Sequence, residues 1–131
     1  MKYIQAFFMS LGMFSAIPCP YRPWNEKARP LMLVALPFVG LVIELLWYGL
    51  FLLLCRISVP LQLQAAVLMV YPYVVTGFIH LDGFMDTSDA ILSRRPLEEK
   101  LRILKDPHTG AFAVISTAIL FILCFASMLS V

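Results

Sequence analysis

Three long apolar segments are the feature that most constrains what this chain can fold into. They cover residues 31–55, 59–81 and 111–131, and Glu44 is the single charged residue within them. A helix needs roughly 20 apolar residues to cross about 30 Å of hydrocarbon, and each segment meets that length. We therefore expect an all-α, polytopic membrane protein with three or four transmembrane or re-entrant segments.

The fourth of these segments is residues 3–17, which are apolar but fewer than in the other three and are followed by prolines. It fits a short span, a re-entrant segment or an interfacial helix. Lys2 before an apolar stretch also resembles a secretory signal. Because Ser15-Ala16-Ile17-Pro18 is a poor cleavage site, we expect the segment to be retained.

The composition supports a membrane protein. Apolar residues make up 61% of the 131 positions and charged residues 14%, against about 45–50% and about 25% in soluble domains. This balance excludes a disordered chain and a disulfide-rich secreted scaffold. The net charge of +2 does not indicate a nucleic-acid partner. We expect one membrane domain over residues 1–131, with the lipid bilayer as its surroundings.

Most charged residues lie in two polar stretches, residues 22–29 and 82–106. These stretches hold most of the lysines and arginines, and two predicted spans separate them, so both lie on the same side of the membrane. Positive residues accumulate on the cytoplasmic side. We therefore expect a multi-pass protein of the cell (inner) membrane whose residues 82–110 form a catalytic loop facing the cytoplasm.

Three aspartates open the second polar stretch. Asp82, Asp86 and Asp89 are spaced i, i+4, i+7, which places their carboxylates on one face of a helix. Like charges this close repel one another, whereas Mg²⁺ or Mn²⁺ prefers such oxygen ligands and bridges to substrate phosphates. The spacing predicts a metal site, and the alternative is a solvated helix end. Gly83 permits close backbone approach beside the first carboxylate.

Two other ionisable residues are candidates for this site. His80 precedes the aspartates and is either a phosphate donor or proton carrier, or an interfacial histidine bonded to a backbone carbonyl. Glu44 lies within a span, where an acid is costly unless it is paired, protonated or facing a cavity. This cost makes Glu44 a functional candidate.

Residues 96–105 predict a short amphipathic helix on the cytoplasmic surface. Pro96 suits its first turn, acidic residues follow at its positive end, and basic residues stand near its last turn. Leu97, Leu101 and Leu104 form an apolar stripe that we expect to pack against the rest of the protein.

Several polar residues flank this helix. Arg94 and Arg95 precede it and either hold phosphate through paired hydrogen bonds or anchor the chain at the membrane surface. Lys105 is its last residue and Asp106 follows it, so a fourth carboxylate returns to the start of the last apolar segment. We expect the two parts of a phosphotransfer site to meet there.

The residues Gly77-x-x-His80-x-Asp82-Gly83-x-x-Asp86-Thr87-x-Asp89, followed by Ile103-x-Lys105-Asp106-x-x-x-Gly110, resemble the signature of adenosylcobinamide-GDP ribazoletransferases. Phe14-Ser-Ala-Ile-Pro-x-Pro20 and Pro37-x-x-Gly40 also resemble this family of bacterial cobalamin (vitamin B12) synthases. The resemblance implies a polytopic, Mg²⁺-dependent inner-membrane enzyme. It implies that adenosylcobinamide-GDP and α-ribazole, or its 5′-phosphate, are joined with release of GMP.

The resemblance also implies roles for the candidate residues. Asp82, Asp86 and Asp89 would hold one or two Mg²⁺ ions on the diphosphate. One of them, or Asp106, would orient or deprotonate the attacking hydroxyl. The leaving phosphate would be neutralised by one of three basic residues, Arg94, Arg95 or Lys105.

The chain also departs from the family pattern. The family usually has a second glycine after Gly77, where this chain has Phe78, and often a glycine after Asp89, where this chain has Ala90. The resemblance gives Glu44 no role. Family members are about twice as long, so the resemblance covers an N-terminal half. We expect such a half to be inactive on its own. Its expected partner is either a separate C-terminal half or a second copy of this chain in a homo-oligomer.

Two alternative functions fit parts of the pattern. A CDP-alcohol phosphotransferase would share the acids, the metal and the membrane, but it has an Ala-Arg pair after its first Asp-Gly and longer spacing to its later aspartates. A non-enzymatic cation-binding membrane subunit would need polar groups lined through the bilayer. Here the ionisable residues other than Glu44 gather at one face.

Overall fold

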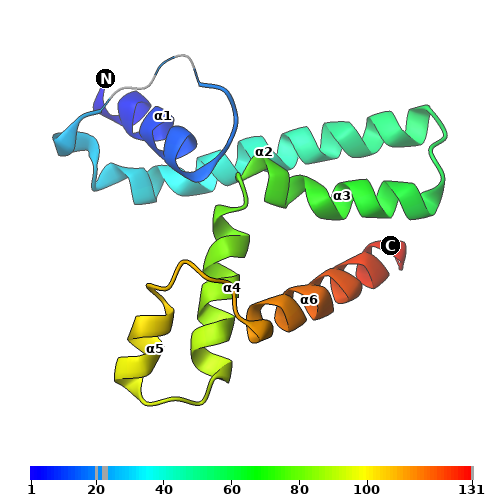
Figure 1. Cartoon of the computed structure of the whole chain (residues 1–131). Helices are drawn as coiled ribbons and strands as arrows, with labels where there is room; N and C mark the ends of the chain where they lie inside the picture. The colour runs from blue at the N-terminus through cyan, green and yellow to red at the C-terminus, as the bar shows by residue number, and fades with distance from the viewer. Residues whose placement is uncertain (20, 22–23, 131) are drawn as a thin grey trace. The chain divides into compact units, whose positions relative to one another are not determined.

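The computed structural model describes residues 1–19, 21 and 24–130, and within them every regular element is helical (Figure 1). This confirms the all-α fold class. Pro20 of the family pattern and Arg22 of the first polar stretch lie outside the described residues. The elements are α1 (Lys2–Phe14), the short 3-10 helix η1 (Glu26–Ala28), α2 (Leu31–Arg56), α3 (Leu61–Val75), α4 (Ile79–Leu92), α5 (Leu97–Ile103) and α6 (Ala111–Leu129).

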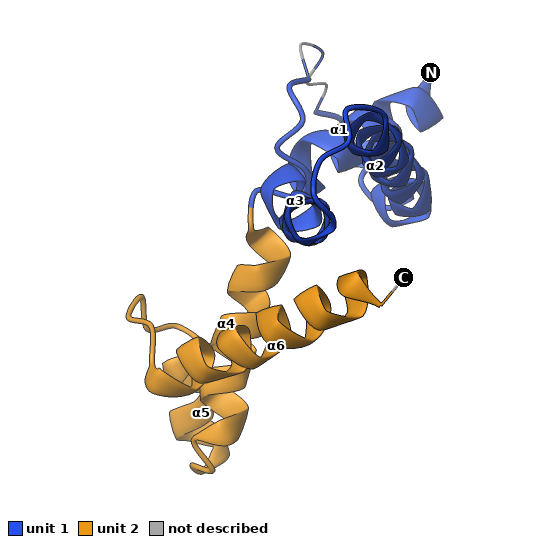
Figure 2. Cartoon of the chain, turned by 90° about the vertical axis from the view of Figure 1, so that its right-hand side faces the viewer, with its two compact units in different colours: residues 1–77 blue, residues 78–131 orange. Residues whose placement is uncertain are grey.

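The chain divides into two compact units, Met1–Gly77 and Phe78–Val131 (Figure 2). The first contains α1 to α3 with η1, and the second contains α4 to α6. Each unit has its own packing, and the single membrane domain over residues 1–131 stays a prediction.

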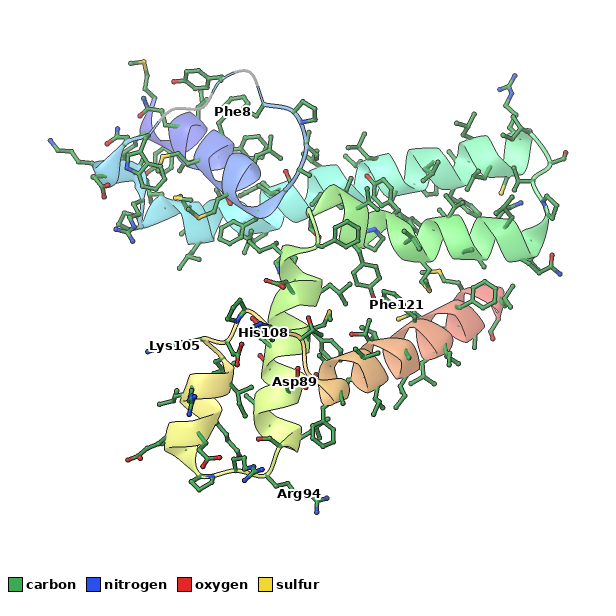
Figure 3. All side chains as sticks on the ribbon, viewed as in Figure 1. Phe8, Asp89, Arg94, Lys105, His108 and Phe121 are labelled. Atoms are coloured by element: carbon green, nitrogen blue, oxygen red, sulfur yellow. The ribbon has the colours of Figure 1, made fainter. Side chains whose placement is uncertain are left out.

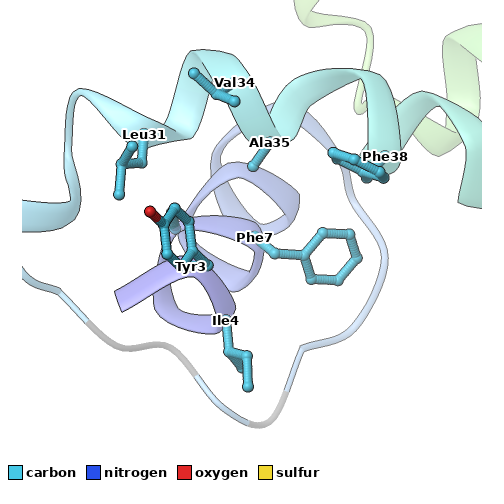
Figure 4. A pocket seen from close by; sticks show the side chains of 8 residues that line it. Tyr3, Ile4, Phe7, Leu31, Val34, Ala35 and Phe38 are labelled. Carbon is cyan, nitrogen blue, oxygen red and sulfur yellow. The ribbon is translucent and has the colours of Figure 1, made fainter. Parts of the chain in front are cut away.

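In the first unit, α1 packs on α2 through small and flexible side chains. Ala6 and Met9 of α1 meet Met32 and Ala35 of α2 and Ala28 of η1 in one buried cluster. Beside it, an apolar pocket of about 390 Å³ lies between the two helices and is lined by residues such as Phe7 and Phe38 (Figure 4). This packing leaves much of α2 exposed, as expected for a helix that is apolar on all sides and faces lipid.

A side-chain hydrogen bond compensates for a proline inside α3. Pro72 has no N–H to donate to the carbonyl of Leu68, four residues earlier. The indole Nε1–H of Trp47 on α2 donates to that carbonyl at 3.0 Å. An unpaired carbonyl is costly in a membrane, so this bond explains how α3 tolerates its proline.

Two of the three predicted spans are continuous helices. By length and composition, α2 and α6 can each cross a membrane, whereas α3 and α4 qualify only when taken together as one broken span. The segment 59–81 is therefore not the single helix that its hydropathy suggested. Gly77 at φ +64° and Phe78 at φ +61° adopt left-handed backbone conformations that end one helix before the next begins.

The undecided first segment forms α1, whose 13 residues reach only about 20 Å, too short to cross about 30 Å of hydrocarbon. The predicted amphipathic helix is present as α5, with Pro96 immediately before it. Its leucine stripe is not packed within its unit, since Leu97, Leu101 and Leu104 are all exposed.

Candidate active site

Helix α4 carries the acidic residues of the candidate site. It contains His80, Asp82, Gly83, Asp86 and Asp89, so the predicted helical register of the three aspartates is confirmed. The helix starts directly after the left-handed turn, which separates these polar residues from the apolar α3.

Asp82 and Asp86 are exposed one helical turn apart. Within the described residues neither side-chain carboxylate has a hydrogen-bonding or ion-pairing partner. A side chain added at Gly83, between them, would meet nothing within 4 Å. The two carboxylates are therefore accessible to a cation or a substrate.

Asp89 is in a different environment, at the contact of α4 with the start of α6 (Figure 3). Only 9% of the residue is exposed. Its Oδ2 accepts a hydrogen bond from the backbone N–H of Gly110 at 2.7 Å, and its Oδ1 accepts one from the N–H of Ala113 at 2.9 Å. The first amides of a helix have no partner within it, so Asp89 caps α6 from another helix.

The loop between α5 and α6 holds a carboxylate–imidazole pair. Asp106 Oδ1 accepts a hydrogen bond from the backbone N–H of His108 at 3.0 Å and lies 2.6 Å from Nδ1 of the same residue. The backbone hydrogen bond is the main cause that lowers the pKa of Asp106 below its ordinary value. The His108 ring and the charge of Arg102 lower this pKa further.

A polar pocket of about 440 Å³ in the second unit lies between the end of α4, the loop between α5 and α6, and the start of α6. Its wall includes three predicted site residues, namely Asp89, Arg95 and Asp106. It also includes three polar residues that the sequence reasoning did not single out, namely Ser93, His108 and Thr109. The position of His108 two residues after Asp106 was the signal available for it, because aspartate commonly binds the backbone N–H two residues on.

The basic candidates lie in different places. Arg95 lines the polar pocket. Its Nε lies 3.7 Å from Oε2 of Glu99, four residues further along the chain. Lys105 lines a neighbouring pocket of about 540 Å³ with Asp106. Arg94 has a left-handed backbone at φ +53° after the end of α4, and its side chain points away from the helix (Figure 3).

Comparison with known proteins assigns the chain to a family. The model of a family described as cobalamin-5-phosphate synthase matches residues 6–131. This chain belongs to that family. The match includes α4, the Asp106–His108 loop and the start of α6, so the candidate site lies within the family region.

Three curated relatives share the printed name adenosylcobinamide-GDP ribazoletransferase. One from Clostridium perfringens (strain ATCC 13124) is 49% identical over 129 residues, covering 98% of this chain and 51% of the relative. One from Clostridium botulinum (strain Eklund 17B) is 46% identical and covers 95% of this chain and 49% of the relative. One from Lachnoclostridium phytofermentans is 38% identical, covering 95% and 48%. The chain spans about half the length of these relatives, and no solved structure matches it.

The donor set on α4 fits a magnesium ion in part. The described residues hold no group of three or more His, Cys, Asp or Glu side chains arranged to bind a metal. Asp82 and Asp86 nevertheless offer exposed carboxylate oxygens, and Mg²⁺ is commonly held by one or two carboxylates together with water and substrate phosphates. These two residues therefore suit a metal ion that a phosphorylated substrate also binds.

The two remaining candidates are His80 and Glu44. His80 is exposed in the first turn of α4 and does not line the polar pocket. Glu44 is exposed on α2, in the first unit. The roles of both residues stay predictions.

Proposed function

We propose that this chain forms part of a membrane enzyme that transfers adenosylcobinamide phosphate from adenosylcobinamide-GDP to α-ribazole or its 5′-phosphate. The support that carries the proposal is the family match over residues 6–131 together with relatives of that printed name. The exposed Asp82 and Asp86 agree with it, because phosphoryl transfer depends on positioning and on charge neutralisation.

In the proposed reaction, a hydroxyl oxygen of the ribazole attacks the phosphorus that carries adenosylcobinamide. The bond from that phosphorus to the bridging oxygen breaks, and the electron pair leaves with GMP. The hydroxyl proton passes to a carboxylate, for which we propose Asp106, because it lines the polar pocket together with Arg95.

The charges in the site have separate proposed roles. Asp82 and Asp86 would hold Mg²⁺, and the bound ion would neutralise the charge of the diphosphate. Arg95 and Lys105, which line the two polar pockets, bind the leaving phosphate, with Arg94 as a further candidate. We place this site on the cytoplasmic side of the inner membrane, because the lysines and arginines gather around it.

The test is GMP release from adenosylcobinamide-GDP and α-ribazole with Mg²⁺ in lipid vesicles. The chain is assayed alone and as a hybrid in which it replaces the matching half of the Clostridium perfringens relative. We expect release by the hybrid and its loss on Asp82→Asn or Asp86→Asn. Glu26→Gln, which removes an exposed carboxylate of η1, is the matched control and should retain release.

The outcomes separate the alternatives. Release by the chain alone would show that this half suffices. A hybrid that binds Mn²⁺ but releases no GMP would favour the cation-binding subunit. Normal release by Asp82→Asn would contradict the assignment of that carboxylate.

A further inference from the structure

We propose that Asp89 is a positioning residue, which holds the Asp106–Gly110 loop and the first turn of α6 against α4, and not a ligand of the metal ion. This inference rests on the proposed function, which makes Asp106 in that loop the proton acceptor. It gives Asp89 a role different from that of Asp82 and Asp86, although the spacing of the three residues places them together.

The hydrogen bonds of Asp89 carry the inference. Each carboxylate oxygen accepts a backbone N–H, from Gly110 at 2.7 Å and from Ala113 at 2.9 Å. Asp89 is the buried member of the three aspartates, whereas Asp82 and Asp86 are exposed. A metal ion bound by Asp89 would have to compete with two charge-assisted hydrogen bonds at a nearly closed position.

The backbone of α6 is fitted closely to this carboxylate. A Cβ atom built on Gly110 would lie 2.5 Å from Oδ1 and 2.7 Å from both Cγ and Oδ2 of Asp89. Gly110 therefore admits the carboxylate because it has no side chain. The partial positive charge at the start of α6 also attracts the carboxylate oxygens of Asp89.

The contact fixes the loop that carries the proposed proton acceptor. Gly110 follows His108 by two residues, and His108 holds Asp106 through its backbone N–H and its ring. Asp89, Asp106, His108 and Gly110 all line the same polar pocket, with Arg95 on its wall. Asp89 therefore acts on the reaction through Asp106 and His108, without touching the substrate itself.

The first test separates a metal ligand from a helix cap. Mn²⁺ affinity and amide hydrogen exchange are measured on the chain in lipid nanodiscs, for Asp89→Asn, Asp89→Ala and the matched control Asp86→Asn. We expect Asp89→Asn to change the Mn²⁺ Kd by less than about twofold and Asp86→Asn to weaken it by at least about tenfold. Exchange at Gly110 and Ala113 should rise by about tenfold in Asp89→Asn, more in Asp89→Ala, and remain unchanged in Asp86→Asn.

The second test reads the positioning of Asp106 directly. In a ¹³C NMR titration of the Asp106 carboxyl, Asp89→Asn should move the pKa of Asp106 upward, toward its ordinary value, because the loosened loop weakens the His108 hydrogen bonds. A cap that served only the stability of α6 would leave this pKa unchanged. We expect the pKa of Asp106 to rise less in Asp89→Asn than in Asp89→Ala, because the asparagine amide keeps one acceptor oxygen.

Three results would overturn the inference. They are a loss of Mn²⁺ affinity in Asp89→Asn equal to that in Asp86→Asn, unchanged exchange at Gly110 and Ala113, and an unmoved Asp106 pKa. A chain that binds no Mn²⁺ in any form would contradict the metal site of the proposed function. The exchange and titration results would then decide the role of Asp89 by themselves.

Discussion

Replacing Gly110 with alanine tests the contact between α4 and α6 by adding one methyl group. Gly110 has φ −87° and ψ 171°, an extended conformation that alanine adopts without strain. The new Cβ would nevertheless lie 2.5 Å from Oδ1 of Asp89, closer than real Cβ atoms approach other heavy atoms. Either the carboxylate or the start of α6 must move.

The magnitude follows from the hydrogen bonds that this movement breaks. A hydrogen bond to a charged group contributes about 1.5–3 kcal/mol, and loss of an N-cap costs about 0.5–2 kcal/mol. Alanine returns about 0.4–1 kcal/mol by restricting the unfolded chain. We expect Gly110→Ala to lower the free energy of unfolding by about 1–3 kcal/mol, and the Tm by about 4–12 °C.

The assay is thermal unfolding in detergent micelles, followed by far-UV circular dichroism. Gly83→Ala is the matched control. Gly83 lies on α4, the helix that carries Asp89, and a Cβ added there would meet nothing within 4 Å. We expect this control to raise the Tm, since alanine is the better helix residue. A Gly110→Ala protein that melts at or above the wild-type temperature would refute the reasoning.

Three further predictions concern other contacts. Trp47→Phe should destabilise the first unit by about 1–3 kcal/mol in the same unfolding assay, because the carbonyl of Leu68 loses its donor. Phe78→Gly should stabilise the chain by up to about 1 kcal/mol in that assay, because glycine adopts φ +61° without the steric cost borne by phenylalanine. His108→Ala should raise the pKa of Asp106 in a ¹³C NMR titration. Since that pKa is lowered in the folded protein, the Asp106–His108 contact stabilises the loop at neutral pH and is lost as the pH falls below the ordinary pKa of an aspartate.

Local features of the second unit were predictable from the sequence. The spacing of the aspartates predicted one helix, and Pro96 with the charges after it predicted the next, because helix periodicity and end effects depend on neighbouring residues. Hydropathy did not show the break at Gly77 and Phe78, since an apolar residue satisfies the same pattern in a helix or in a left-handed turn.

The sequence by itself determined that this is a helical membrane protein with a group of carboxylates beside an apolar segment. Those properties follow from hydropathy and from helical spacing, which are local. Only the tertiary structure decided that Asp89 faces the start of α6 while Asp82 and Asp86 remain exposed. Gly110 is separated from Asp89 by 21 residues, and the contact depends on how α4 packs against α6, which no local pattern specifies.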